Sequence, residues 1–192
     1  MKNKNRNVPI LLKAAPECDN VGHQEAAVPE IEIATAYYES PIGTIEIRGT
    51  DAGVSDLNFF DLKEERSVRR IKSAPPGPVA DALAQLEGYF RGSRKAFTVR
   101  LDLRGTPFQM KVWAELLRVG FGQTTTYKAL AVAVGQPAAT RAVGGANHGN
   151  PISIIVPCHR VVGSDGRLTG YGGGLWRKEW LLRHEGGSGL FI

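Results

Sequence analysis

This chain is organised around one stretch, Ile152-Ser153-Ile154-Ile155-Val156-Pro157-Cys158-His159-Arg160. Five mostly apolar residues lie between Pro151 and Pro157, and a short apolar run bounded by prolines is typical of a buried strand. Such a strand would deliver Cys158 at its exit, where the core meets a surface. A cysteine placed only for packing would more often lie within the run, so its position favours a reactive thiol.

Composition narrows the class of protein. With 192 residues, 42% of them hydrophobic, the chain can form one large domain or two small ones around a buried core. No apolar run reaches the roughly 18 residues of a membrane span, and the charged start is unlike a signal peptide. Cys18 and Cys158 lie far apart, so we expect no disulfide framework and a reducing compartment, the bacterial cytoplasm or nucleoid.

The net charge of +5 is uneven along the chain. Residues 1–96 carry 13 Lys and Arg against 14 Asp and Glu, whereas residues 97–192 carry 11 against 5. The excess positive charge therefore lies in the half that contains Cys158. Charge alone leaves two interpretations equally open, a solvated basic surface or a surface that binds a polyanion.

The first half is predicted to be a flexible leader followed by a scaffold. Residues 1–30 have no hydrophobic period, and Cys18 and His23 fall short of the four ligands of a structural zinc site. Alternating apolar residues and Gly/Pro/Asp turns then predict an antiparallel meander. Its strands are 33–38, 44–48 and 54–60. Nothing in residues 31–103 assembles a catalytic set.

More elements are expected before the second half begins. Residues 61–73 can hold a short helix. Pro78 suits the first turn of another, which Gly92 ends. Residues 97–103 alternate between apolar and polar, which predicts one more strand or an extended linker.

The second half is predicted to start with three helices. Thr106 can cap the first, which ends by Gly120. Two more, at about 126–134 and 138–146, flank a turn at 135–137 in a helix-turn-helix pattern. By spacing alone, an ordinary pair of packed helices is the stronger interpretation.

The third of these helices has small residues almost throughout, with Arg141 as its one long side chain near the start. Sequence reading in the major groove needs several long polar side chains, and this helix could offer Arg141, Asn147 and His148 at most. Small residues instead allow a close minor-groove approach, with one side chain inserted into the base stack. Close helix–helix packing explains the composition equally well.

A reactive cysteine needs a neighbouring base or cation to ionise. His159 is adjacent to Cys158, but neighbouring side chains on an extended segment point to opposite faces. A turn or a bridging water could connect them, and Glu185 could orient the imidazole. Otherwise Cys158 is a small buried apolar residue and His159 a core histidine.

Six motifs in a fixed order closely resemble the O6-alkylguanine-DNA alkyltransferases, also called methylated-DNA–protein-cysteine methyltransferases. They are Gly105–Gln109, Thr126-Tyr127, Arg141–Ala146, Gly149–Pro151, Pro157–Val161, and Lys178–Leu182 with His184–Gly186. The resemblance implies an α/β (α+β) fold. A ribonuclease-H-like β-sheet domain at 31–103 would precede a winged helix-turn-helix-like domain at 104–186 that carries the active-site Cys, with a tail at 187–192.

The resemblance also implies roles for individual residues. Cys158 would be the nucleophile, His159 a base acting through water, Glu185 its orienting partner, and Asn150 the support of the turn before the strand. Tyr127 would rotate the target nucleotide and Arg141 would fill the vacated place. Further DNA contacts would come from Ala142, Gly144 and Asn147. The alkyl pocket would be lined by Val161, Tyr171, Gly172, Gly173 and Ser153.

The implied function is direct reversal of DNA damage in a single turnover. An alkyl group from O6-alkylguanine in duplex DNA, or from O4-alkylthymine, would pass to Cys158 after base flipping, without a cofactor, a metal or a membrane, in a monomer. Gly172 stands where some relatives have a hydroxyl residue, which would leave only backbone donors for O6. Two alternatives stay open: a winged-helix DNA-binding module with a structural Cys158, and a cysteine hydrolase with multiple turnover.

Overall fold

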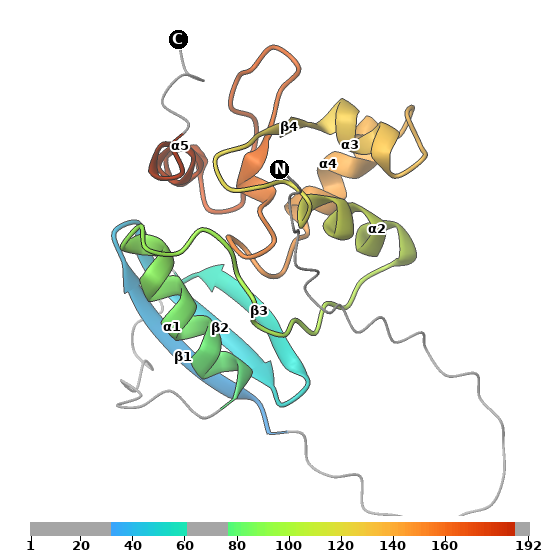
Figure 1. Ribbon diagram of the computed structural model, residues 1–192. Helices are drawn as coiled ribbons and strands as arrows, with labels where there is room; N and C mark the ends of the chain where they lie inside the picture. Colours follow the sequence, from blue (N-terminus) through green and yellow to red (C-terminus); the bar gives the residue numbers. More distant parts are fainter. Residues whose placement is uncertain (1–31, 61–76, 187–192) are drawn as a thin grey trace, which may run out of the picture.

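The computed structural model describes residues 32–60 and 77–186. The expected leader, the helix expected within residues 61–73 and the expected tail lie outside these ranges. In chain order, a sheet with one helix is followed by a mainly helical part (Figure 1). The mixed α/β fold predicted from the sequence is confirmed.

Three antiparallel strands form the sheet in the order β1, β2, β3. They are β1 (Ala34–Ser40), β2 (Gly43–Thr50) and β3 (Gly53–Phe59), so the predicted meander is confirmed. Helix α1 (Pro78–Phe90) starts with the expected proline and packs against all three strands (Figure 1). Its buried residues include Val79, Leu86 and Tyr89.

The outer edge of β3 pairs with two later segments of the chain. The Val54 amide donates to the Arg100 carbonyl over 2.9 Å. Further along, the Leu57 amide donates to the Pro151 carbonyl and the Ser153 amide donates to the Leu57 carbonyl, each over 2.8 Å. The sequence left two options for residues 97–103, a strand or an extended linker. They form mostly an extended linker, with a single β-bridge at Leu101. The sheet is hydrogen-bonded to the chain just before Cys158.

The helical part begins with α2 (Pro107–Leu116), whose N-terminus is closed by a reciprocal pair of hydrogen bonds between Thr106 and Gln109. A turn at Gly135 separates α3 (Tyr127–Ala133) from α4 (Thr140–His148), and the two helices pack together, as both interpretations of this pattern predicted. Helix α4 starts and ends about two residues later than expected. A short parallel pair, β4 (Thr125–Thr126) and β5 (Val161–Val162), and α5 (Leu175–His184) complete the fold.

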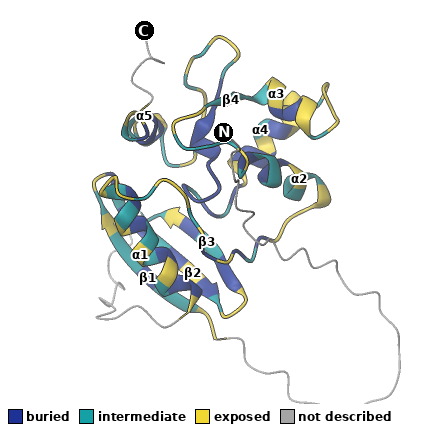
Figure 2. Ribbon diagram, in the orientation of Figure 1, coloured by how far each residue is buried: buried dark blue, intermediate teal, exposed yellow. Residues whose placement is uncertain are grey.

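The predicted strand at 152–156 is wrong, although its burial is right. Ile152 forms one bridge with Leu57, and the chain then turns: the Val156 amide donates to the Ile152 carbonyl over 3.0 Å. Ile154 adopts a φ of 70°, which is rare for a β-branched residue. Most of residues 152–162 are nevertheless buried (Figure 2). An apolar run predicts burial, but it does not distinguish a strand from a buried turn.

None of the helices in the described ranges is long and apolar enough to cross a membrane.

Candidate active site

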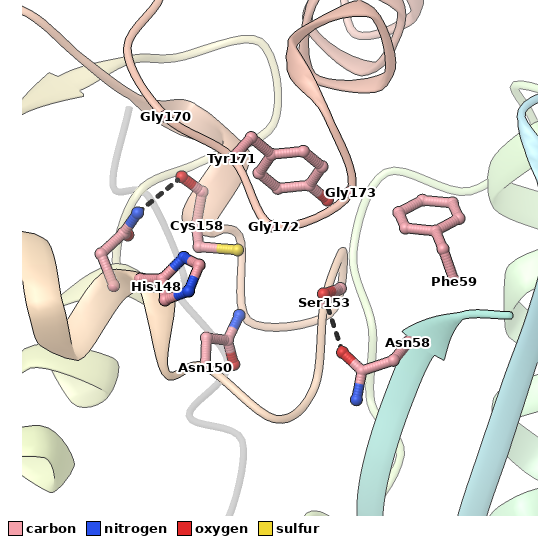
Figure 3. A pocket seen from close by; sticks show the side chains of 11 residues that line it. Asn58, Phe59, His148, Asn150, Ser153, Cys158, Gly170, Tyr171, Gly172 and Gly173 are labelled. Carbon is pink, nitrogen blue, oxygen red and sulfur yellow. Dashed lines mark hydrogen bonds between the residues drawn. The ribbon is translucent and has the colours of Figure 1, made fainter. Parts of the chain in front are cut away.

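Cys158 lies at a pocket of about 330 Å³ that is built from both halves of the chain. The short helix η2 (Cys158–Arg160) starts at this cysteine, whose residue surface is only 4% exposed. Figure 3 shows its sulfur pointing into the space that the lining side chains surround. The other lining residues are Asn58, Phe59, Asn147, His148, Asn150, Ser153, Gly170, Tyr171, Gly172 and Gly173.

A buried ionic network lies next to the thiol on η2. His159 Nε2 is 3.0 Å from Glu185 Oε1, and both side chains are fully buried. Arg160 donates hydrogen bonds to both oxygens of the same carboxylate from Nε and Nη2, each over 2.8 Å. The Tyr89 hydroxyl donates to Oε1 over 2.8 Å and the Gly122 amide to Oε2 over 3.2 Å. Both carboxylate oxygens are thereby satisfied despite their burial.

This network fixes the protonation of His159. Burial alone would raise the pKa of the Glu185 carboxyl, but hydrogen bonds and charge from His159 and Arg160 hold it well below its usual range. An ionised carboxylate only accepts hydrogen bonds, so His159 Nε2 must donate. Burial lowers the pKa of the imidazole, against the pull of Glu185. The ring is therefore neutral at pH 7, and Nδ1 carries a free lone pair that can take a proton.

The Cys158 thiol is protonated at rest, because burial raises its pKa. The Asn150 amide and the positive charge of Lys178 act in the opposite direction. Lys178 is fully buried, and its ammonium donates to the carbonyls of Val161 over 2.6 Å and Thr169 over 2.7 Å. A protonated thiol needs a base before it can attack, and the next residue in the chain, His159, has a neutral imidazole.

Three buried polar atoms have no hydrogen-bond partner within the described ranges: His159 Nδ1, Asn147 Oδ1 and the Tyr171 hydroxyl. Asn147 and Tyr171 line the pocket with Cys158. Buried polar atoms are nearly always paired in a folded protein. The two unpaired atoms at this pocket indicate a place where a ligand or water completes the hydrogen bonds.

Asn150 supports the turn that leads to Cys158, at the position where the resemblance placed it. Its side-chain nitrogen donates to the Val156 carbonyl over 2.8 Å, and its oxygen accepts from the Ile152 amide over 3.0 Å. One amide side chain thus holds both ends of the turn, which replaces the hydrogen bonds of the strand expected there.

Most residues expected to contact DNA lie on or beside α4. Arg141 and Ala142 are exposed, Gly144 is half-buried, and Tyr127 lies half-buried at the start of α3, its hydroxyl accepting from Thr169 over 3.2 Å. Asn147 differs from the expectation. It is buried, and its amide nitrogen donates to the Cys158 carbonyl over 3.4 Å, so it belongs to the pocket rather than to the exposed helix face.

Four of the five expected pocket residues line the pocket: Tyr171, Gly172, Gly173 and Ser153. Val161 does not. It is fully buried in β5, where it pairs with Thr125 of β4, and its carbonyl holds Lys178.

Sequence reasoning missed the part that the sheet domain plays. Asn58 and Phe59 line the pocket and Tyr89 bonds to Glu185, so residues 31–103 are more than the scaffold expected from them. These contacts join residues about a hundred positions apart and leave no local signal. Arg160 and Lys178 lay inside the quoted motifs, and the charge of Arg160, two residues after Cys158, could have marked it.

Comparison with known proteins identifies two family models on this chain. The 6-O-methylguanine DNA methyltransferase ribonuclease-like domain matches residues 33–103, and the DNA binding domain of the same name matches residues 107–187. A methylated-DNA–protein-cysteine methyltransferase of Methanosarcina barkeri is 46% identical over 147 residues, 77% of this chain and 93% of the relative. One of Mycobacterium bovis is 47% identical over 77% of this chain and 88% of its own length.

Solved structures agree with these matches. The O6-methylguanine methyltransferase of Mycobacterium tuberculosis has a TM-score of 0.69 and 41% identity, covering 82% of this chain and 94% of its own. A structure of M. tuberculosis OGT in complex with DNA has a TM-score of 0.69 and 43% identity, covering 80% and 92%.

Proposed function

The chain belongs to the 6-O-methylguanine DNA methyltransferase family, and on that premise we propose that it repairs DNA by moving an alkyl group from guanine O6 to Cys158. The observation that carries the proposal is the buried Cys158 thiol facing a pocket, next to a histidine whose Nδ1 is a free base. Neither a structural cysteine nor a plain DNA-binding module needs this combination.

The damaged base has to leave the duplex to react. The thiol of a cysteine that is only 4% exposed cannot reach O6 of a stacked guanine. The exposed face of α4 offers Arg141 as the side chain that takes the vacated place, while Gly144 allows the backbone to come close. Because alkylated guanine pairs poorly, extruding it costs less than extruding a normal base.

The chemical step starts with the Cys158 proton. The proton passes to His159 Nδ1, directly or through one water, while Glu185 stabilises the imidazolium that forms. The thiolate then attacks the alkyl carbon, so that a carbon–sulfur bond forms as the carbon–oxygen bond breaks. The electron pair of the broken bond stays on guanine, which takes up the proton lost by the thiol. The products are intact guanine and an alkylated Cys158.

This outcome makes the protein a single-use reagent. A thioether is stable, and no group at the described site is placed to hydrolyse it. The proposed step needs no residue beyond this pocket and the network next to it, and we propose that the protein acts as a monomer. We extend the proposal to O4-alkylthymine as a second substrate, because its alkyl group also sits on an exocyclic oxygen.

The test is the mass of the protein after incubation with duplex DNA containing O6-methylguanine. One methyl group per molecule should appear on the Cys158 peptide, and Cys158→Ser should stay unmodified. Turnover should stop after one equivalent of substrate. An unmodified Cys158 in a protein that still binds the duplex would contradict the proposal, and multiple turnover would favour a hydrolase.

A further inference from the structure

Phe59 brings the sheet domain into the wall of the pocket. It is the last residue of β3, and its ring lines the pocket. Figure 3 shows the ring across the pocket from the Cys158 sulfur, beyond Tyr171. Because Cys158 and Phe59 line the same pocket, an alkyl group on the sulfur that fills the pocket would approach this ring.

The ring of Phe59 lies directly against the glycine loop. A Cβ atom added to Gly173 would come within 2.7 Å of Phe59 Cδ2 and 2.9 Å of Tyr171 Cε1, closer than real contacts allow. The rings of Phe59 and Tyr171 meet edge to face with centroids 6.5 Å apart. Gly173 is therefore required by close packing, and Phe59 and the loop form one continuous surface.

Arg177 holds Phe59 and the loop together. Its guanidinium carbon lies 4.6 Å from the centre of the Phe59 ring and 4.5 Å from that of Trp176. Nε donates to the Ile42 carbonyl and Nη1 to the Gly173 carbonyl, each over 2.7 Å. One planar cation thus joins the β1–β2 turn, the end of β3 and the pocket loop.

The strand that carries Phe59 has little freedom to move away. Leu57 exchanges backbone hydrogen bonds with Pro151 and Ser153. Asn58 adds a side-chain bond to the Pro151 carbonyl over 3.1 Å. The wall is therefore fixed to the segment that positions Cys158.

We propose that Phe59, positioned by Arg177, limits the size of the alkyl group that the protein accepts. This inference rests on the proposed function. An alkyl group that reacts must place its first carbon at the sulfur, so any further carbons have to occupy the pocket. The pocket of about 330 Å³ has to hold the flipped guanine as well as its alkyl group, so a fixed aromatic ring in its wall reduces the space left for the alkyl group. Phe59 is a specificity residue and Arg177 a positioning residue.

The experiment compares rates of transfer to Cys158 from two duplexes of one sequence, containing O6-methylguanine or O6-benzylguanine. Phe59→Ala should raise the benzyl-to-methyl rate ratio by about ten-fold or more, the scale at which pocket volume discriminates between substrates. Phe59→Leu should give a smaller rise. Arg177→Lys keeps the charge but loses the planar stacking and the paired hydrogen bonds, so it should move the ratio in the same direction.

Phe60→Ala is the matched control, since Phe60 is the next residue, packs edge to face on Tyr37 and does not line the pocket. Its ratio should equal that of the unchanged protein. A ratio that stays constant in both Phe59 variants while methyl transfer continues would overturn the inference. The proposed function would fail differently, by the absence of methyl transfer in the unchanged protein. If Phe59→Ala does not fold, Phe59→Leu decides.

Discussion

His159 and Glu185 form a buried contact of 3.0 Å between Nε2 and Oε1, and neither side chain reaches solvent. The carboxylate comes from the residue just after α5, and the imidazole from η2. Arg160 neutralises the carboxylate from η2 as well. The charge that orients the proposed base is thus balanced inside the protein and does not depend on salt in the solvent.

Removing the Glu185 charge should damage both stability and transfer. Glu185→Gln leaves Arg160 buried without its counterion, and breaking a buried pair in this way costs about 3–5 kcal/mol in the free energy of unfolding. Transfer should slow because the imidazolium loses its partner. Urea denaturation and single-turnover rates measure the two effects. Glu179→Gln, which breaks the exposed pair with Arg183, should change stability by less than about 0.5 kcal/mol.

The transfer rate should fall in acid with the titration of His159. Burial lowers its pKa from the ordinary 6.5, and transfer needs the neutral ring. The rate should therefore fall with a midpoint below pH 6.5. Rate constants for one turnover across this range measure the midpoint. A midpoint above 6.5 would contradict the assignment of His159 as the base.

Folding stability should respond to the same residue. The pKa of His159 is lower in the folded chain, so the unfolded chain binds the proton first as the pH falls. The contribution of His159 to the free energy of unfolding is therefore present above the ordinary value of 6.5 and is lost as the pH falls through the folded pKa. Glu185 adds a further loss below its own ordinary value of 4.5, since its folded pKa is also lowered. Denaturation of His159→Gln should lack the first loss and keep the second.

Lys178 should lower the pKa of the Cys158 thiol through its charge. Lys178→Met removes that charge and leaves the Val161 and Thr169 carbonyls without their donor. We expect the thiol pKa to rise and transfer to slow, with the largest effect below pH 8, because burial lowers the lysine pKa to about 8. Thiolate absorbance against pH measures this. Lys111→Met, an exposed change on α2, serves as the control.

Arg141→Ala should separate base flipping from chemistry. Arg141 is exposed on α4, where it can take the place of a flipped base, and a free base needs no flipping. The rate of transfer from duplex DNA should therefore fall by about ten-fold or more, while the rate of transfer from free O6-alkylguanine should change little. Both rates can be read from the mass of the Cys158 peptide. Arg118→Ala removes a charge of similar exposure from the end of α2 and should leave both rates unchanged. An equal loss on both substrates would remove Arg141 from the flipping step.

Features that depend on neighbours in sequence could be predicted, and features that depend on distant contacts could not. The Thr106 cap, the Pro78 helix start and the three-stranded meander follow from local rules, and the structure confirms them. The 152–156 strand failed because Asn150 supplies the hydrogen bonds that a strand partner would have supplied. The apolar pattern alone does not reveal that a side chain takes the place of a strand partner.

The same contrast between local signals and distant contacts holds for the residues of the candidate active site. The contact between Glu185 and His159 was anticipated through the family resemblance, and the structure brings the two together, while their roles in transfer stay predictions. Tyr89 and Phe59 were missed because each reaches the site across the boundary between the two halves. Asn147 was expected to contact DNA, and its position at the pocket beside Cys158 could not be predicted because it depends on how α4 packs against η2.

The pairing of β3 with Pro151 and Ser153 bears on whether the two halves can be used as separate modules. A fragment that begins near residue 104 would lose the strand partner of the Cys158 segment, the Tyr89 hydroxyl on Glu185 and the Phe59 wall together. The exposed backbone edge left on each fragment would also invite aggregation. Engineers who wish to transplant this chemistry should therefore move the whole unit, since the boundary between its halves passes through the reactive centre.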